Sequence, residues 1–257
     1  VKSSWKPETL LPEQALGFSV QLYFNKGCWG DLFTSRQLMA LTTFSDSVQT
    51  VHEKIKNDAR NAGFPEDDRS LDEGGYGARA YADAVAIYLA FAVDRMANTV
   101  CTIARWTCDR EQTVTVFARQ AIPMSWDYPE VNPFAGAAGD YSISVKGVIK
   151  GIPNIKAVSG IVHQADVVSQ NYSINKIIST DPPYYDNIGY ADLSDFFYVW
   201  LRRAIKHILP NLFATVATPK VEELVATPSR HGGRNNAEVF FMDGMTQAMQ
   251  RLAEQAH

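Results

Sequence analysis

The four residues Asp181, Pro182, Pro183 and Tyr184 combine groups that could prepare an aromatic amino group for reaction. Such a nitrogen is a poor nucleophile, because its lone pair is delocalised into the ring. The Asp181 carboxylate and the Pro182 carbonyl could accept its two N–H bonds and favour a tetrahedral nitrogen with a localised lone pair. The prolines fix φ and lack an N–H, so the loop is stiff and offers acceptors without competing donors. Tyr184 adds an aromatic face on which a flipped base could stack. These four residues are the predicted catalytic group.

The sequence around this tetrapeptide favours a site over an ordinary turn. A short β-branched run at residues 174–180 predicts a strand that ends at Asp181. In open α/β sheets, ligands bind at the carboxyl ends of strands. A helix is predicted to follow from Asp192, as its cap, to about Leu209, where Pro210 stops it. The order of strand, loop and helix therefore suits an active site.

A first helix is predicted from a capping box, in which Thr34 is the N-cap and Gln37 stands three residues later. Apolar or small residues recur from Leu38 onward at steps of three and four, which gives one continuous stripe. Gly63 and Pro65 end the helix in the expected order.

Further elements are predicted along the rest of the chain. Residues 78–98 form a helix that is apolar on nearly all sides and should be central. Residues 113–117 alternate as a strand would, but they could equally begin a helix. Residues 157–165 predict a second strand, and residues 237–256 predict a final amphipathic helix.

Composition limits the compartment and the chemistry. The chain has 257 residues, 46% of them apolar, which is ordinary for a globular protein. Its three cysteines, Cys28, Cys101 and Cys108, have no metal-ligand spacing, and no metal is predicted. An odd number of cysteines without a signal peptide favours a reducing, cytoplasmic setting. The longest apolar run, residues 84–93, is half a membrane span and predicts a buried helix.

The charge distribution points to a nucleic-acid partner. The net charge is −4, but the stretch 196–234 holds six basic and two acidic residues, hence +4, and leaves −8 elsewhere. Arg202, Arg203 and Lys206 are the predicted phosphate contacts, and Arg202 and Lys206 lie four apart on one helix face. Tyr185 is a further predicted nucleic-acid contact. A solvated helix face is the alternative interpretation of this stretch.

Two glycine motifs resemble nucleotide-binding loops. Residues 75–80 fit the pattern G-x-G-x-x-A, and residues 133–139 resemble a glycine-rich cofactor loop. Neither follows an apolar strand, which this kind of loop needs. We therefore expect neither of them to be the principal cofactor loop.

With these residues in hand, the chain resembles the middle and later part of a large bacterial and archaeal family of adenine-specific DNA methylases, whose members open with a domain of unknown function. The strongest block is 181–203, and its part from 181 to 200 is highly specific. The other blocks that carry the resemblance are residues 29–34, 80–86, 117–121, 132–134, 164–166, 218–220 and 230–233.

The resemblance implies an α/β fold with a Rossmann-like class I methyltransferase core. The methyl donor would be S-adenosylmethionine (S-adenosyl-L-methionine), and the acceptor the N6 amino group of adenine in DNA. Asp166, just past the predicted strand 157–165, would bind the adenine amino group of the cofactor; a turn aspartate that caps a short helix is the alternative. Residues 1–150 would be a helical and irregular segment packed on the core, and residues 151–257 the methyltransferase part.

The resemblance also implies that the principal glycine-rich cofactor loop and a zinc-ribbon insert lie upstream of Val1, so the chain is expected to be a fragment. Two rival functions stay open. One is methylation of RNA bases, at guanine N2 or at adenine, because such enzymes also use Asp-Pro-Pro-Tyr. The other is a catalytically incomplete nucleic-acid-binding fragment that keeps the fold and the basic stretch.

Overall fold

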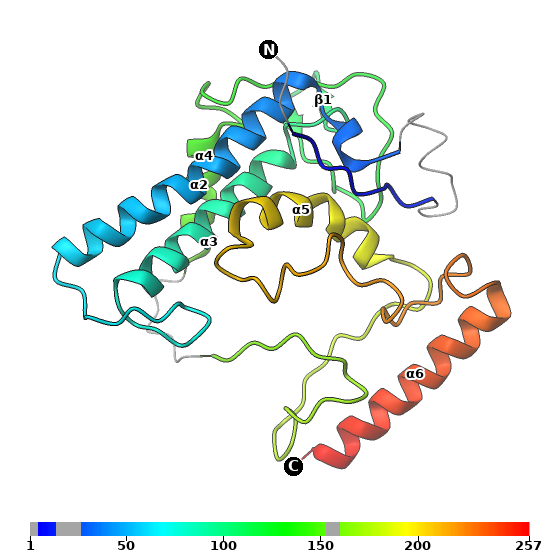
Figure 1. Ribbon diagram of the computed structural model, residues 1–257. Helices are drawn as coiled ribbons and strands as arrows, with labels where there is room; N and C mark the ends of the chain where they lie inside the picture. The colour runs from blue at the N-terminus through cyan, green and yellow to red at the C-terminus, as the bar shows by residue number, and fades with distance from the viewer. Residues whose placement is uncertain (1–4, 14–26, 153–159, 257) are drawn as a thin grey trace.

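The computed structural model describes residues 5–13, 27–152 and 160–256, and these are mainly helical (Figure 1). The elements in chain order are η1 (Trp29–Leu32), α2 (Ser35–Asn61), α3 (Ala78–Ala97), β1 (Arg105–Thr107), β2 (Gln112–Val114), α4 (Tyr141–Gly151), α5 (Tyr190–Ile205) and α6 (Arg234–Gln255).

Helix α2 begins at the predicted capping box. The Gln37 amide donates to the Thr34 hydroxyl at 3.2 Å, and the Gln37 side-chain oxygen accepts from the Thr34 amide at 2.9 Å. This exchange satisfies two amides that the first helical turn leaves without partners. The helix ends at Asn61, and Gly63 follows with φ of 82°. Both predicted ends of this helix are confirmed.

Helix α3 is central, as predicted, because α2, α4 and α5 all pack against it. Its alanines Ala82, Ala86 and Ala90 are buried, and their small side chains let neighbouring helices approach closely. None of the helices that the structure describes is long and apolar enough to cross a membrane.

An aromatic cluster joins helix α5 to the segment around η1. Phe33 stacks on Phe196 with ring centroids 5.7 Å apart and meets Trp200 edge-on at 5.2 Å. Trp29 lies edge-on to Phe196 at 6.0 Å. Aromatic pairs at such distances add to the stability that burial supplies. Helix α5 is therefore anchored along the face that carries Phe196 and Trp200.

The predicted Rossmann-like fold is wrong. In residues 5–13, 27–152 and 160–256, the only sheet is the antiparallel pair β1–β2, with Trp106 opposite Thr113. Strand β2 covers only the start of the segment 113–117, where strand and helix were both open. A class I methyltransferase core needs a parallel sheet of several strands, which this arrangement lacks.

The two strands predicted for that core do not form in the described residues. In the segment 174–180 only one isolated parallel bridge is present, between Lys176 and Ala256. Residues 160–165 have no strand partner, and residues 157–159 lie outside the described part of the chain. Ile177 is 97% exposed and Val162 is 94% exposed. The β-branched pattern reports a local preference, but a strand is stable only when it pairs and packs.

Two helix ends also differ from the prediction. Asp192 does not cap α5: the helix begins at Tyr190 after Gly189, and Asp192 lies in its first turn. The helix ends at Ile205, before the predicted end at Leu209. The final helix is confirmed over most of its length, although it begins earlier, at Arg234.

Both glycine motifs are explained by local packing. A Cβ added at Gly75 or Gly77 would come within 2.2 and 2.3 Å of backbone oxygens in the preceding loop, so that loop needs glycine to close on itself. In the second motif, the Gly136 amide donates to the Asp140 carboxylate, which also caps α4. These hydrogen bonds lower the pKa of Asp140 to about 2.

Burial separates the described chain into two regions. The helical region comprises residues 29–152 and 190–213, where α2, α3, α4 and α5 lie side by side (Figure 1). The pocket region comprises residues 160–189 and 216–256 and includes α6, which lies apart from the other helices (Figure 1).

Candidate functional site

The predicted catalytic residues lie in an exposed loop between the segment 174–180 and helix α5. The Tyr184 hydroxyl donates to the Asp181 carboxylate at 3.1 Å, and this hydrogen bond raises the pKa of Tyr184. Tyr184 is 53% exposed, so solvent reaches about half of the residue. Carboxylate and ring are therefore adjacent, as a site for an aromatic amine requires.

Tyr185 turns the chain directly after the tetrapeptide. Its φ is 57°, in the left-handed region that few residues other than glycine adopt. Its carbonyl accepts from the Ala226 amide at 3.0 Å, and its ring meets Phe241 of α6 edge-on at 5.1 Å. Partial burial raises the pKa of Tyr185, and a hydrogen bond to Glu238 raises it further. Tyr185 thus ties the loop to α6, and its predicted contact with nucleic acid stays a prediction.

A pocket of about 680 Å³ adjoins the loop. It brings together Asp166, the predicted cofactor ligand, and Asp181 with its two prolines; Tyr184 is not among the described residues that line it. Thr180 directly precedes Asp181, and the remaining walls come from three places in the chain: Gln164, Ala165, Val167 and Val168; Pro219, Glu222 and Leu224; and Met245, Ala248, Met249 and Leu252 of α6.

The pocket is apolar and acid-lined. Its three ionisable side chains, Asp166, Asp181 and Glu222, are all carboxylates, and no lysine or arginine is among the described residues that line it. A phosphate group would meet only repulsion from these charges. A ligand that combines a flat apolar ring with positive charge matches both the apolar walls and the carboxylates.

The Asp166 carboxylate also has a local structural role. Its two oxygens accept from the Val168 amide at 3.0 Å and from the Ser169 hydroxyl at 3.2 Å. This is the turn geometry that was the alternative interpretation of Asp166. Each carboxylate oxygen can accept more than one hydrogen bond. The turn therefore leaves acceptor capacity for a ligand, and cofactor binding by Asp166 stays a prediction.

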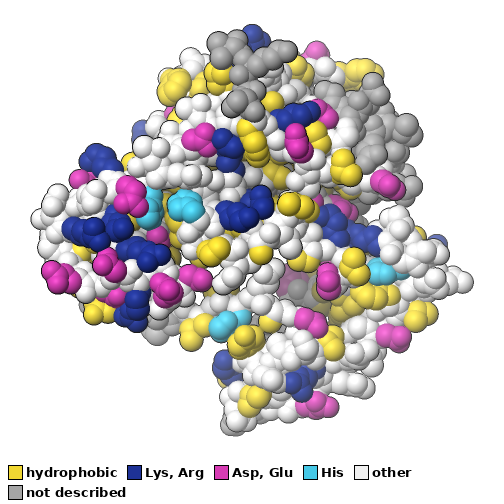
Figure 2. All heavy atoms as spheres, viewed as in Figure 1, with side chains coloured by type: hydrophobic (Ala, Val, Ile, Leu, Met, Phe, Trp, Pro, Cys, Tyr) yellow, Lys and Arg dark blue, Asp and Glu magenta, His cyan; other side chains and the backbone are white. Residues whose placement is uncertain are grey.

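The three predicted phosphate contacts differ in their surroundings. The Arg202 Nε atom donates to the Thr215 carbonyl at 2.8 Å. The Arg203 guanidinium donates to Asp46 at 2.8 Å and lies over the Trp5 ring at 4.4 Å. Lys206 is exposed at the end of α5. On the face shown in Figure 2, basic side chains are interspersed with acidic ones. Lys206 is therefore the residue of the three best placed for a phosphate.

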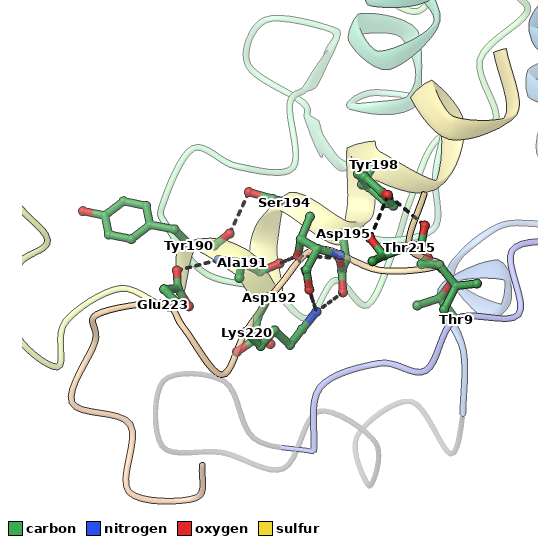
Figure 3. A network of polar contacts seen from close by, with 12 residues as sticks. Thr9, Tyr190, Ala191, Asp192, Ser194, Asp195, Tyr198, Thr215, Lys220 and Glu223 are labelled. Atoms are coloured by element: carbon green, nitrogen blue, oxygen red, sulfur yellow. Dashed lines mark hydrogen bonds and ion pairs between the residues drawn. The ribbon is translucent and has the colours of Figure 1, made fainter. Parts of the chain in front are cut away.

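The basic balance of the stretch 196–234 is offset by acids just outside it. Lys220 pairs with Asp195, Arg230 pairs with Asp192, and Arg234 pairs with Glu238. Asp192 and Asp195 stand three residues apart on helix α5, next to the start of the stretch (Figure 3). Sequence reasoning missed these partners, although acids at that spacing share a helix face and could have been matched with the later lysine and arginine.

The α6 wall of the pocket was also missed. Its four lining residues follow steps of three, one and three, the spacing of a single helix face. The amphipathic pattern of this helix was recognised, but the surface that its apolar face would meet was not.

Neither a protein-family model nor a curated protein nor a solved structure matches the chain. The resemblance to adenine-specific methylases therefore rests on the sequence blocks that carry it.

Proposed function

We propose that this protein takes part in methyl transfer from S-adenosylmethionine to the N6 amino group of adenine in DNA. The observation that carries the proposal is the pocket that Asp166 and the stretch Asp181-Pro182-Pro183 line together. Asp166 and Asp181 are fifteen positions apart in the sequence, and the sequence predicts a role in methyl transfer for each of them. The partner would be DNA and the compartment the cytoplasm.

The character of the pocket fits the proposed methyl donor. S-Adenosylmethionine carries a sulfonium, an ammonium and a carboxylate group beside an adenine ring, hence one net positive charge, and it supplies an electrophilic methyl group. Met245, Met249 and Leu252 offer the apolar surface for a ring, while Asp166 and Asp181 face it with negative charge. Both carboxylates are exposed, so their attraction for a positive charge is screened by water and is modest.

The acceptor end of the proposed reaction uses the exposed loop. Asp181 and the Pro182 carbonyl would each accept one N–H of the flipped adenine, which localises the lone pair on the nitrogen. The nitrogen would then attack the methyl carbon of the donor, the carbon–sulfur bond would break to leave the neutral thioether S-adenosylhomocysteine, and the nitrogen would lose one proton to solvent. Catalysis in this scheme is positioning and hydrogen bonding.

Tyr184 has two positions in this proposal. Without substrate, its hydroxyl donates a hydrogen bond to the Asp181 carboxylate. When a base enters, the amino group of the base replaces the hydroxyl as the hydrogen-bond donor to Asp181. The released ring of Tyr184 is then free to stack on the base.

Transfer of a tritiated methyl group to unmethylated DNA and to RNA, assayed side by side, tests the proposal. We expect label in DNA at adenine, and no label with Asp181→Ala. Label in RNA instead would support the rival RNA methyltransferase. Absence of label from both, together with retained DNA binding, would support a catalytically silent binding module.

A further inference from the structure

Asp195 on helix α5 is a buried carboxylate with three donors. Its side chain is 2% exposed. One oxygen accepts from the Thr218 amide at 2.8 Å and from the Thr218 hydroxyl at 2.7 Å, and the other accepts from the Lys220 ammonium at 2.5 Å. Figure 3 shows Lys220 reaching Asp195 from the neighbouring segment. A buried charge that is paired and fully hydrogen-bonded holds its partners tightly, because an unpaired one would be costly.

Glu223 makes a second connection to the same helix. One of its oxygens accepts from the Ala191 amide at 2.8 Å, at an N-terminal amide that the helix leaves free (Figure 3). Its other oxygen accepts from the Arg230 guanidinium at 2.6 Å, and Arg230 also donates to Asp192 at 2.6 Å. The side chains of Arg230, Glu223 and Asp192 are each 14% exposed. The ion pairs are therefore shielded from solvent.

The segment 218–224 lies between helix α5 and the pocket, and different residues of the segment contact each of them. Three of its residues bond to α5 or its ion pairs: Thr218, Lys220 and Glu223. Three others line the pocket: Pro219, Glu222 and Leu224. Each residue that lines the pocket is next in the chain to one that is bonded to the helix. The position of the pocket wall thus depends on the hydrogen bonds behind it.

Helix α5 also begins close to the predicted catalytic loop. Ile188, which is buried, and Gly189 connect that loop to the first turn of the helix. The hydrogen bonds of Asp195 and Glu223 therefore hold the wall 218–224 on the helix that directly follows the loop with Asp181. Two walls of the pocket, the loop with Asp181 and the segment 218–224, are thus connected to helix α5, which is itself anchored in the aromatic core.

We propose that Asp195 and Glu223 are positioning residues, which hold the wall 218–224 on helix α5 and so set the shape of the pocket beside Asp181. The ligand class rests on the proposed function, whereas the role in holding the wall does not. Neither carboxylate is among the residues that line the 680 Å³ pocket, so each acts through the wall.

The test compares Asp195→Asn with Glu130→Gln in the full chain. Glu130 is a control for the type of hydrogen bond, because its carboxylate likewise accepts from a threonine hydroxyl, Thr34, and from a cation, Arg36. Unlike Asp195 it is exposed, and it is not among the residues that line the pocket. We measure hydrogen–deuterium exchange of residues 218–226 in each variant. We also measure the KM for S-adenosylmethionine and the kcat. We expect faster exchange and a KM raised about tenfold for Asp195→Asn, with kcat nearly unchanged. Glu130→Gln should alter neither.

A second variant keeps the test decisive if Asp195→Asn does not fold. Thr218→Val removes the hydroxyl, which lies 2.7 Å from both Asp195 and the Ala191 carbonyl of α5, and keeps the hydrogen bond from the Thr218 amide to Asp195. It should still speed exchange in the wall and raise KM by a smaller factor. Unchanged exchange and an unchanged KM in the folded variants would overturn the proposal. It would also be overturned if Glu130→Gln changed exchange, KM and kcat as much as Asp195→Asn does. If the unaltered protein binds no S-adenosylmethionine, the proposed function fails, and exchange still decides the role of Asp195.

Discussion

The helical region and the pocket region differ most in what they bury. With the exception of Leu11, the largest fully buried side chains lie in the helical region, Trp29, Phe196 and Trp200 among them. In the pocket region no aromatic side chain, leucine or methionine is fully buried among the described residues, and the apolar residues that are buried are Ile188, Val225, Ala226, Ala237 and Ala248. Burial of large apolar side chains is the main source of stability. The helical region therefore supplies the stability, while the pocket region carries the candidate site on weakly packed chain.

This division has a functional consequence. Segments with few buried apolar contacts open most easily, and sites that must admit a ligand are drawn from them. The predicted site, however, also needs Asp181 held within a narrow range of positions. Helix α5 reconciles the two demands, because one face packs in the aromatic core and its first turns hold the pocket wall through Asp195 and Glu223.

The largest expected effect tests the comparison directly. Trp200→Ala should lower the free energy of unfolding by about 3–5 kcal/mol, because the indole is fully buried between Trp5 and Phe33. Ile177→Ala should change it by less than about 0.5 kcal/mol, since Ile177 is 97% exposed. Urea denaturation of both variants measures the difference.

Trp200→Phe is the control for this pair. The Trp200 indole N–H is buried without a hydrogen-bond partner among the described residues, so phenylalanine removes that unfavourable group while it retains a ring. Its cost should be well below that of alanine. If Ile177→Ala proved as costly as Trp200→Ala, the segment 174–180 would be packed in solution and the two regions would not differ as described.

The second effect concerns activity and should leave stability unchanged. Asp181→Ala should lower the rate of methyl transfer on the order of a hundredfold or more, because a positioned acceptor of the reacting amine is lost. Asp181 is exposed, so the urea midpoint should not move. Single-turnover transfer of a labelled methyl group gives the rate. A near-normal rate would exclude Asp181 from the proposed chemistry.

The helices could be predicted from the sequence, because their signals are local. The Thr34 capping box, the stripe from Leu38 and the terminating Gly63 all act within a few residues of one another, and α2 formed as predicted. The sheet could not be predicted in this way. Ile174 and Ile177 have the residue types of a strand, yet a strand also requires a neighbour that the local pattern does not specify.

The same contrast applies to the candidate site. Asp181 was predicted from its tetrapeptide and Asp166 from its position after a predicted strand, and they do line one pocket, although the strands predicted before them did not form. The wall 218–224 was not foreseen, because its connection to α5 depends on pairs such as Asp195 with Lys220 that are twenty-five residues apart. The acids that pair with the basic residues of the stretch 196–234 were missed for the same reason, and its predicted phosphate contacts stay a prediction.

The third prediction separates the two groups of Tyr184. Phenylalanine retains the ring for stacking and loses only the hydroxyl that donates to Asp181. Tyr184→Phe should therefore change the KM for DNA by less than about threefold, whereas Tyr184→Ala should raise it by about tenfold or more. Steady-state kinetics on one DNA substrate compares them. Equal losses would assign the role to the hydroxyl and contradict stacking.

The smallest expected effect is on salt dependence, and it divides the three residues that were predicted to bind phosphate. Lys206 is exposed, so Lys206→Met should remove one phosphate contact and reduce the slope of log affinity against log salt by about one. Arg202 bonds to the Thr215 carbonyl, so Arg202→Met should lower the stability of the chain and leave the slope nearly unchanged. Fluorescence anisotropy with two unrelated DNA duplexes, over a series of salt concentrations, measures both slopes.

Lys54→Met is the matched control, because Lys54 is an exposed lysine on α2, which belongs to the helical region. If Lys206→Met changed the preference between duplexes and not the slope, Lys206 would contact bases. If all three variants reduced the slope equally, any exposed charge would suffice, and phosphate binding could not be assigned to the end of α5.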